Sequence, residues 1–425
     1  MARALTIAAL VALVALACSG SPGSDSDAVQ VMVFGEPEEL RAYRDLIAAF
    51  AEEEPGVPVQ LVEASDRTDL IARLSTSFSG GSPPDLFLLN YRFYGQFAAR
   101  GVLEALEDRV DASEAFSQSD FFPQALDAFR WEGVLTCLPQ NISSLVVYYN
   151  RDLLADARIP EPEDDWAWAE MVARAVELTT DEDRDGTPEQ YGLGVEPSLI
   201  RLAPFVWSNG GELVDDQEDP NRLTLGSPES LQVLNEFFRL GRELHVLPSE
   251  QEREAEDDES RFMNGRLAML LSSRRSTPTF RTITDFDWDI APLPRFREPV
   301  GILHSDAYCM TRASGRKNEA WRFLEFALGP EGQSITARSG RTVPSLREVA
   351  ESDAFLDPSK PPSRSRVFLD TIPFIRRLPT ISTWPEIEDT TESIIEFGLY
   401  DDVPAPEIAR RLFNATRPLF ERAER

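Results

Sequence analysis

The run VQVMVF, residues 29–34, begins the pattern that decides the fold. Apolar residues then recur at helical spacing from Pro37 to Glu54, where EPG ends the helix. A second β-rich run, VPVQLVE at 57–63, precedes the helical DLIARLSTSF and a third strand, PDLFLL at 84–89. Strand, helix, strand, helix and strand in this order predict a parallel sheet with right-handed crossovers. This part of the chain therefore predicts an α/β lobe.

The length and charge of the chain limit what the rest can be. A chain of 425 residues exceeds what one hydrophobic core usually supports, and the α/β pattern restarts after residue 140, so we expect two lobes. The 73 acidic and 42 basic residues give a net charge of −31. Nucleic acid is excluded as a partner, because binding phosphates along a strand needs a basic face.

The N-terminus has the features of a bacterial export signal. Leu5 to Ala17 is apolar, follows Arg3, and is too short to span a bilayer, which takes roughly 20 apolar residues. The tetrapeptide 15–18, ALAC, resembles a lipobox, although leucine stands one position later than the pattern favours. We therefore predict a signal peptide at 1–17, a lipid on Cys18, a flexible tether over 18–27, and anchoring at the outer face of the cell membrane or in the periplasm.

Two further cysteines, Cys137 and Cys309, lie in apolar strand-like stretches. In an oxidising compartment they are either two separate buried thiols, which we favour, or a structural disulfide. A catalytic cysteine is disfavoured, because the chain holds only His245 and His304 as partners.

A series of ordered landmarks resembles the extracellular solute-binding proteins that serve ABC sugar importers, the group that includes the maltodextrin-binding protein. No single motif is specific, but their joint order across residues 30 to 420 is. The landmarks include FAEEEPGVPVQL (50–61), GSPPDLFLLN (81–90), GVLTCLPQN (133–141), WSNGGELVDD (207–216), FMNGRLAMLLSS (262–273), GRTVPSL (340–346) and TWPEIEDTTESII (383–395).

The resemblance implies a two-lobe, periplasmic-binding-protein-like α/β fold of type II, with discontinuous lobes joined by hinge strands. Lobe one would take 28–139 and 301–344, and lobe two 143–297 and 345–425. Pro139, Pro294 with Pro299, and Pro344 mark the expected hinges. The fold also suggests that Cys137 and Cys309 pair if they lie on neighbouring strands. The implied function is a monomeric, non-enzymatic receptor without a cofactor, which captures a carbohydrate by hinge closure and delivers it to a membrane permease.

Sugar-binding chemistry and the family pattern together select the candidate site. Aromatic faces pack on a pyranose ring, polar side chains bind its hydroxyls, and ligands meet the carboxyl ends of strands. The residues expected to bind ligand are Glu36, Asn90, Tyr91, Asn141, Trp207, Asn209, Gly210, Ser273, Arg274, Ser305 and Trp384. Trp384 is the favoured aromatic platform, because it matches the C-terminal platform of the maltodextrin-binding protein. Gly35, His304 and Arg341 are weaker candidates.

The segment DEDRDGTPEQYG offers a second, weaker site. Asp181, Asp183 and Asp185 occupy positions one, three and five of a calcium loop, but position twelve is Gly192 instead of a bidentate glutamate. We favour a metal-free surface turn.

Two other functions are also compatible with the sequence. A receptor of similar shape for a polyamine, a glycerophosphodiester or iron would also fit the sequence. The negative net charge favours the polyamine, which is a polycation. A surface glycosidase would need a placed acid and base, and no motif singles out such a pair.

Overall fold

The computed structural model describes residues 27–424. The predicted signal segment, Cys18 and the predicted tether up to residue 26 lie outside the described residues. Within 27–424, none of the helices combines the length and apolar character that crossing a membrane requires.

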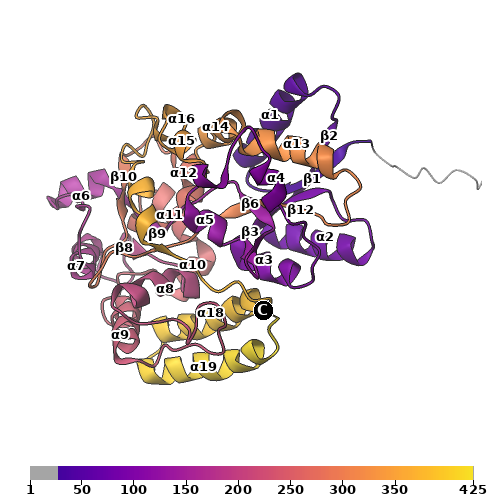
Figure 1. The fold of residues 1–425 in the computed structure, drawn as a ribbon. Coiled ribbons are helices and arrows are strands. Elements are labelled where there is room, and N and C mark those ends of the chain that lie inside the picture. Colours follow the sequence, from indigo (N-terminus) through magenta and orange to yellow (C-terminus); the bar gives the residue numbers. More distant parts are fainter. Residues whose placement is uncertain (1–26, 425) are drawn as a thin grey trace, which may run out of the picture.

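The first lobe is built on a five-stranded sheet in the order β2-β1-β3-β12-β6. The predicted parallel arrangement of the first three strands is confirmed, and β12 joins them antiparallel to β3. Figure 1 shows β12 and α13, from late in the chain, among the indigo N-terminal elements. The strands are β1 (Val29–Phe34), β2 (Val59–Ala64), β3 (Leu86–Asn90), β6 (Cys137–Pro139) and β12 (Asp306–Met310). The main helices are α1 (Pro37–Glu53), α2 (Arg67–Ser79), α3 (Tyr91–Ala98), α13 (Lys317–Leu328) and α14 (Pro330–Arg338).

The second lobe is built on a four-stranded sheet in the order β10-β7-β9-β8, in which only β8 and β9 are parallel. Its strands are β7 (Val146–Asn150), β8 (Tyr191–Gly194), β9 (Leu267–Ser272) and β10 (Trp288–Pro292). Its helices are α6 (Arg151–Ala157), α7 (Trp168–Leu178), α8 (Leu199–Ser208), α9 (Pro228–Arg242), α10 (Glu250–Ala255), α11 (Asp258–Met263), α12 (Thr277–Phe280), α17 (Val367–Asp370), α18 (Trp384–Tyr400) and α19 (Ala405–Glu421).

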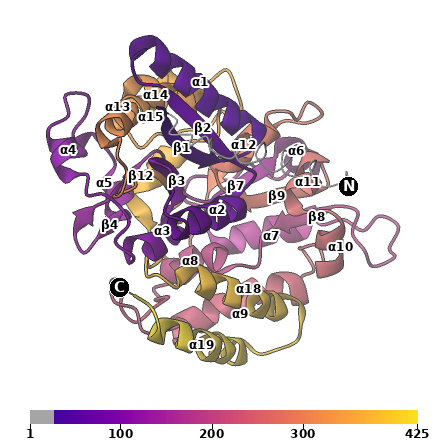
Figure 2. The same ribbon diagram turned by 90° about the vertical axis from the view of Figure 1, so that its right-hand side faces the viewer.

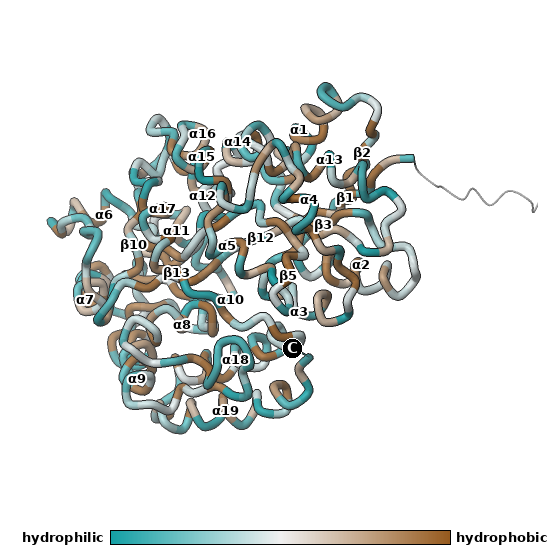
Figure 3. Tube along the Cα trace, in the orientation of Figure 1, coloured by the Kyte–Doolittle hydropathy of each residue, from teal (hydrophilic) through white to brown (hydrophobic). Residues whose placement is uncertain are grey.

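Helices α8, α9, α18 and α19 pack together on one side of this lobe (Figure 2). Along the outer helices the hydropathy changes every few residues, as expected where one face is buried (Figure 3). Shorter elements complete the chain. They are α4 (Glu107–Asp111), α5 (Pro123–Asp127), β4 (Arg130–Trp131), β5 (Val134–Leu135), β11 (Gly301–Ile302), α15 (Arg347–Ala350), α16 (Asp353–Leu356), β13 (Ile375–Arg376) and the 3-10 turns Gln118–Asp120, Arg274–Ser276 and Ile372–Phe374.

The chain passes between the lobes at three neighbouring places. Asn141 forms a bridge with Pro344, and Ser143 forms one with His304, so the three crossing segments lie side by side. Pro139 and Pro344, two of the expected hinge prolines, lie in these segments. The exact lobe ranges stay a prediction. The structure adds that α15 and α16, which follow the predicted boundary at 344, contact α14 of the first lobe.

Cys137 and Cys309 form a disulfide, so the favoured expectation of two separate thiols is wrong. The two residues are paired across the antiparallel strands β6 and β12, with a Cα–Cα distance of 4.3 Å. Their positions in the sequence did not decide this, because 172 residues separate them and only the sheet order makes them neighbours.

Candidate ligand-binding cleft

A polar cavity of about 360 Å³ lies where the two lobes meet. The first lobe contributes the segments that follow β1, β2 and β3, the second lobe those that follow β8 and β9, and the crossing segments contribute one histidine and one arginine. The lining residues are Phe34, Gly35, Glu36, Ser65, Asp66, Arg67, Thr68, Arg92, Glu196, Ile200, Arg201, Ser273, Arg275, His304 and Arg341.

Strand direction explains why these residues gather here. β1, β2 and β3 run parallel, so their carboxyl ends and the helices that begin there share one edge of the sheet. Helices α1, α2 and α3 all start at this edge, and α8 of the second lobe starts beside Ile200 and Arg201. A side chain in place of Gly35, in the turn into α1, would collide with the Glu39 side chain, which would then have to move.

Five arginines dominate the lining, and four of them have carboxylate partners. The partnered ones are Arg92 with Glu388 (3.0 and 2.9 Å to its two carboxylate oxygens), Arg201 with Glu196 (3.1 Å), Arg275 with Glu259 (2.8 Å) and Arg341 with Glu39. Arg67 differs, because no ion pair is formed by it within the described part of the chain. Its guanidinium instead lies 5.5 Å from the ring centre of Phe34 and 5.7 Å from that of Phe93.

The titration of the lining groups follows from burial and from this concentration of positive charge. Burial, reinforced by Arg92, lowers the pKa of Arg67 to about 10. The pKa of His304 falls well below its ordinary value because the imidazole is buried and faces Arg201, Arg92 and Arg67. The proximity of Arg201 lowers the pKa of Glu196. At neutral pH the histidine is therefore neutral, while Glu196 is ionised.

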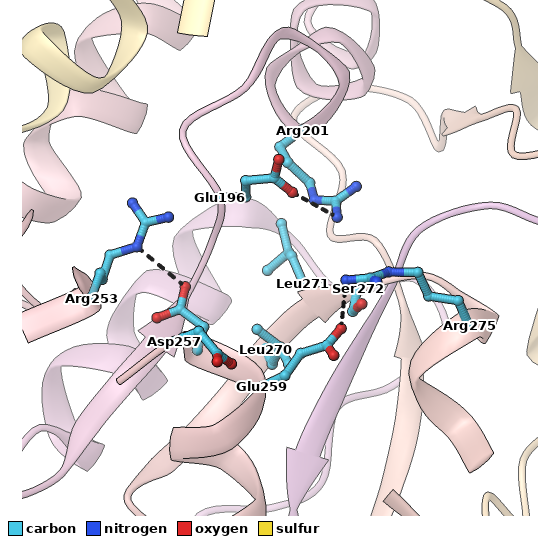
Figure 4. A pocket seen from close by; sticks show the side chains of 10 residues that line it. Glu196, Arg201, Arg253, Asp257, Glu259, Leu270, Leu271, Ser272 and Arg275 are labelled. Atoms are coloured by element: carbon cyan, nitrogen blue, oxygen red, sulfur yellow. Dashed lines mark hydrogen bonds and ion pairs between the residues drawn. The ribbon is translucent and has the colours of Figure 1, made fainter. Parts of the chain in front are cut away.

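A second hollow of about 370 Å³ adjoins the cleft and shares Glu196, Arg201 and Arg275 with it. Both acidic and basic side chains line its wall, and several of them form ion pairs, as Figure 4 shows. Arg253 lies 3.8 Å from Asp258 in this wall. The residues that line this hollow all belong to the second lobe, so of these two adjoining hollows the first is the one that both lobes line.

A family model described as bacterial extracellular solute-binding protein matches residues 45–361. The chain belongs to this family. The expected resemblance is thereby confirmed, and the family consists of binding proteins. A galactooligosaccharide-binding protein of Bacillus subtilis is 21% identical, over 84% of each chain. A maltooligosaccharide ABC transporter solute-binding lipoprotein of Streptococcus pneumoniae is 22% identical, over 97% of this chain and 94% of the relative.

Solved structures of similar fold confirm the predicted two-lobe architecture. An ABC substrate-binding protein from Listeria monocytogenes, in complex with cycloalternan, has a TM-score of 0.83 with 24% identity, covering 92% of this chain and 98% of that one. The sugar-binding protein MalE from Xanthomonas citri has a TM-score of 0.80 with 19% identity, covering 93% and 97%.

In this solute-binding protein, Glu36 and Ser273 of the predicted ligand residues line the cleft, together with the weaker candidates Gly35, His304 and Arg341. Whether they contact ligand stays a prediction.

Asn90, Asn141 and Ser305 lie behind the cleft wall. The side-chain amides of Asn90 and Asn141 each donate to the carboxylate of Asp306, at 3.0 and 3.3 Å, and the Ser305 hydroxyl donates to the carbonyl of Asn141. Asn90 also accepts a hydrogen bond from Nε of Arg92 at 3.3 Å. These three residues are in the right region but are absent from the cavity lining, and of them Asn90 supports a lining residue, Arg92.

Tyr91 and Arg274 point into the protein interior. Tyr91 is fully buried, and its hydroxyl accepts a hydrogen bond from the backbone of Leu378. Arg274 is 1% exposed and donates to the carbonyl of Gly340, while its neighbour Arg275 faces the cleft. The chain turns into a 3-10 helix at Arg274, so successive side chains there point in different directions.

Trp207, Asn209 and Gly210 belong to the end of α8, at the opposite end from the cleft. Trp207 is 4% exposed and is covered by the guanidinium of Arg376 at 4.7 Å from its ring centre. Asn209 is also buried and donates to the carbonyl of Glu229. Gly210 has a φ of +84°, the left-handed conformation that lets the chain leave the helix.

Trp384 has no exposed face for a sugar, because its relative exposure is 0%. It starts α18 and packs edge to face on Phe420, with ring centres 6.4 Å apart. The structure therefore places the favoured platform in the packing between α18 and α19.

The rule that ligands meet strand ends would have found several residues that were missed. Asp66, Arg67 and Thr68 follow β2, and Glu196 follows β8, although neither strand end was used. Arg201 lies within α8 and carries no such signal, whereas Arg275 follows β9 and differs from the chosen Arg274 only by one position in the 3-10 turn.

The acidic turn brings Asp181 and Asp183 together with Glu189, whose ligand oxygens lie within 4.8 Å of one another. Asp185 instead accepts a hydrogen bond from the backbone of Thr187 at 2.8 Å. A carboxylate outside the predicted trio thus takes the third place, and the metal-free turn stays the favoured prediction.

Proposed function

We propose that this protein is the substrate-binding component of an ABC importer, that it captures a carbohydrate between its lobes, and that it presents the closed form to a membrane permease. The observation that carries the proposal is the cavity whose wall is supplied by both lobes and by the crossing segments. A ligand bound there contacts both lobes at once, so it favours the closed arrangement over the open one.

Carbohydrate is the solute class best supported. Relatives that align over most of the chain carry the names of galactooligosaccharide- and maltooligosaccharide-binding proteins. The cleft offers carboxylate, hydroxyl and guanidinium groups, which are the donors and acceptors that sugar hydroxyls need. The binding cycle needs no covalent step, and we propose that the protein is not an enzyme. We further propose that a lipid on Cys18 holds it at the outer face of the membrane.

A ligand screen with the purified mature protein tests the proposal. We expect at least one neutral or acidic mono- or oligosaccharide to raise the melting temperature, and spermidine and iron to leave it unchanged. Arg201→Ala, inside the cleft, should reduce that shift, whereas Arg410→Ala, on the exposed face of α19, should preserve it. Stabilisation by spermidine or iron, with none by any carbohydrate, would overturn the proposal.

A further inference from the structure

We infer that the captured sugar carries a negatively charged group, a phosphate or a carboxylate, which Arg67 and Arg201 bind. This inference rests on the proposed function and narrows its ligand class. The cavity wall holds five arginines against the three acids Glu36, Asp66 and Glu196. Glu388, Glu259 and Glu39, which lie behind the wall, pair with Arg92, Arg275 and Arg341. Among the described residues, Arg67 is therefore the lining arginine that is left without an ion pair.

Arg67 is the first element of the anion site. Its Nε is buried and has no hydrogen-bond partner, and the rings of Phe34 and Phe93 lie against its guanidinium. A partly buried charge that forms no ion pair is costly to keep, and neighbouring arginines increase that cost. An anionic ligand group in the cleft would supply the missing partner, with the planar geometry that guanidinium groups bind well.

Arg201 faces the same cavity from the second lobe. It is 6% exposed, one of its terminal nitrogens forms an ion pair with Glu196, and its Nε has no hydrogen-bond partner. Nε2 of His304, another lining residue, is likewise buried and unpartnered. The depressed pKa of His304, caused by burial and then by Arg201, Arg92 and Arg67, supports a positive potential in this space.

Helix orientation adds to this potential. Arg67 is the first residue of the 13-residue helix α2, and Arg201 lies in the first turn of the 10-residue helix α8. The N-terminal end of each helix thus points at the cleft, and helix N-termini favour anions.

The aromatic content of the wall points the same way. Apart from His304, Phe34 is the sole aromatic residue among the described residues that line the cavity, and the guanidinium of Arg67 lies over its ring. The cleft therefore offers charge, and little of the flat aromatic surface on which a neutral sugar ring packs.

Calorimetry on matched ligands tests the inference. Each neutral sugar is compared with its acidic derivatives: glucose with glucose 6-phosphate and glucuronate, and galactose with galactose 6-phosphate and galacturonate. Inorganic phosphate and maltotriose are run alongside. The variants are Arg67→Ala, Arg67→Lys and, as a matched control, Arg73→Ala, which removes an exposed arginine from the same helix.

We expect one acidic derivative to bind at least tenfold more tightly than its neutral parent, and the preferred derivative distinguishes phosphate from carboxylate. Arg67→Ala should weaken that binding at least tenfold, Arg67→Lys less, and Arg73→Ala by less than twofold. The unliganded Arg67→Ala protein should melt no lower than the wild type, because the change removes a partly buried charge that forms no ion pair.

Neutral sugars that bind as tightly as their acidic derivatives, or acidic-sugar binding that Arg67→Ala leaves unchanged, would overturn the inference while leaving the proposed function intact. Binding of inorganic phosphate without binding of any sugar would overturn both.

Discussion

At the residue scale, burial decides what Trp384 contributes. Its side chain is fully buried against Phe420, so Trp384→Ala should lower the free energy of unfolding by about 3–5 kcal/mol. The milder Trp384→Phe should cost less and stay folded. We expect sugar affinity in the Phe variant to remain within about twofold of the wild type, as measured by calorimetry beside urea unfolding. A folded Trp384→Phe protein that had lost its sugar affinity would instead place this ring on the ligand.

Glu39 should make stability depend on pH. Burial raises its pKa to about 7 from an ordinary value of 4.5, against the opposing effect of Arg341. The folded protein therefore holds this proton more tightly than the unfolded chain, so stability falls as the pH rises from about 4.5 to about 7. Glu39→Gln removes the titration and keeps an acceptor for Tyr43, which donates to Glu39 at 3.1 Å.

Urea unfolding at pH 5 and pH 8 measures this effect. Between pH 5 and pH 8, we expect the free energy of unfolding to fall by on the order of 1–3 kcal/mol more in the wild type than in Glu39→Gln. Glu407→Gln, a change at an exposed carboxylate on α19, serves as the control and should follow the wild type. Equal pH profiles for the wild type and Glu39→Gln would show that Glu39 is ionised throughout this range.

Some of the residues that line the cavity could be predicted from the sequence, and others could not. Glu36 was placed correctly in the cleft wall because it directly follows a strand whose direction was predictable. Arg274 was predicted in place of its neighbour Arg275. A 3-10 turn decides which of the two arginines faces the cavity, and the sequence pattern does not predict that turn. Asn90 and Asn141 lie behind the cavity wall because both donate hydrogen bonds to Asp306. The sequence does not show this pairing, because Asp306 lies on a strand from a distant part of the chain.

At the scale of elements, the disulfide joins two strands of the first lobe that are distant in the sequence. Cys137→Ala with Cys309→Ala should lower the free energy of unfolding by about 2–4 kcal/mol, because the link closes a long loop in the unfolded chain. Thermal unfolding with and without a reductant measures the difference. The wild type with reductant should approach the double variant, while an unchanged double variant would mean that the link adds no stability.

The helices and strands were easier to predict than their order in the sheets. The first three strands and their intervening helices follow from hydrophobic periodicity, which is a local property. The insertion of β12 between β3 and β6 is not local, since Asp306–Met310 returns to the first sheet only after all four strands of the second sheet, β7 to β10, have passed in the sequence. The same limit applied to the cysteines, whose pairing follows from the neighbouring positions of β6 and β12.

At the scale of the whole molecule, an ion pair at the cleft links the two lobes. Arg92 of α3 donates two hydrogen bonds to Glu388 of α18, and their side chains are 16% and 12% exposed. Helix α3 packs on the first sheet, whereas α18 packs with α8, α9 and α19 of the second lobe. If closure brings these helices together, this pair contributes to the closed state, and ligand binding and pairing reinforce each other.

Glu388→Gln should therefore weaken ligand binding through closure. The variant leaves Arg92 with a neutral partner in a buried position, which raises the free energy of the closed state more than that of an open, hydrated one. We expect affinity for the captured sugar to fall by about tenfold, equal to about 1.4 kcal/mol. Small-angle scattering should show that more ligand is needed to reach the compact form, while Glu407→Gln behaves as the wild type. If affinity and the scattering titration stay unchanged, the pair between α3 and α18 is not coupled to closure, and the prediction is wrong.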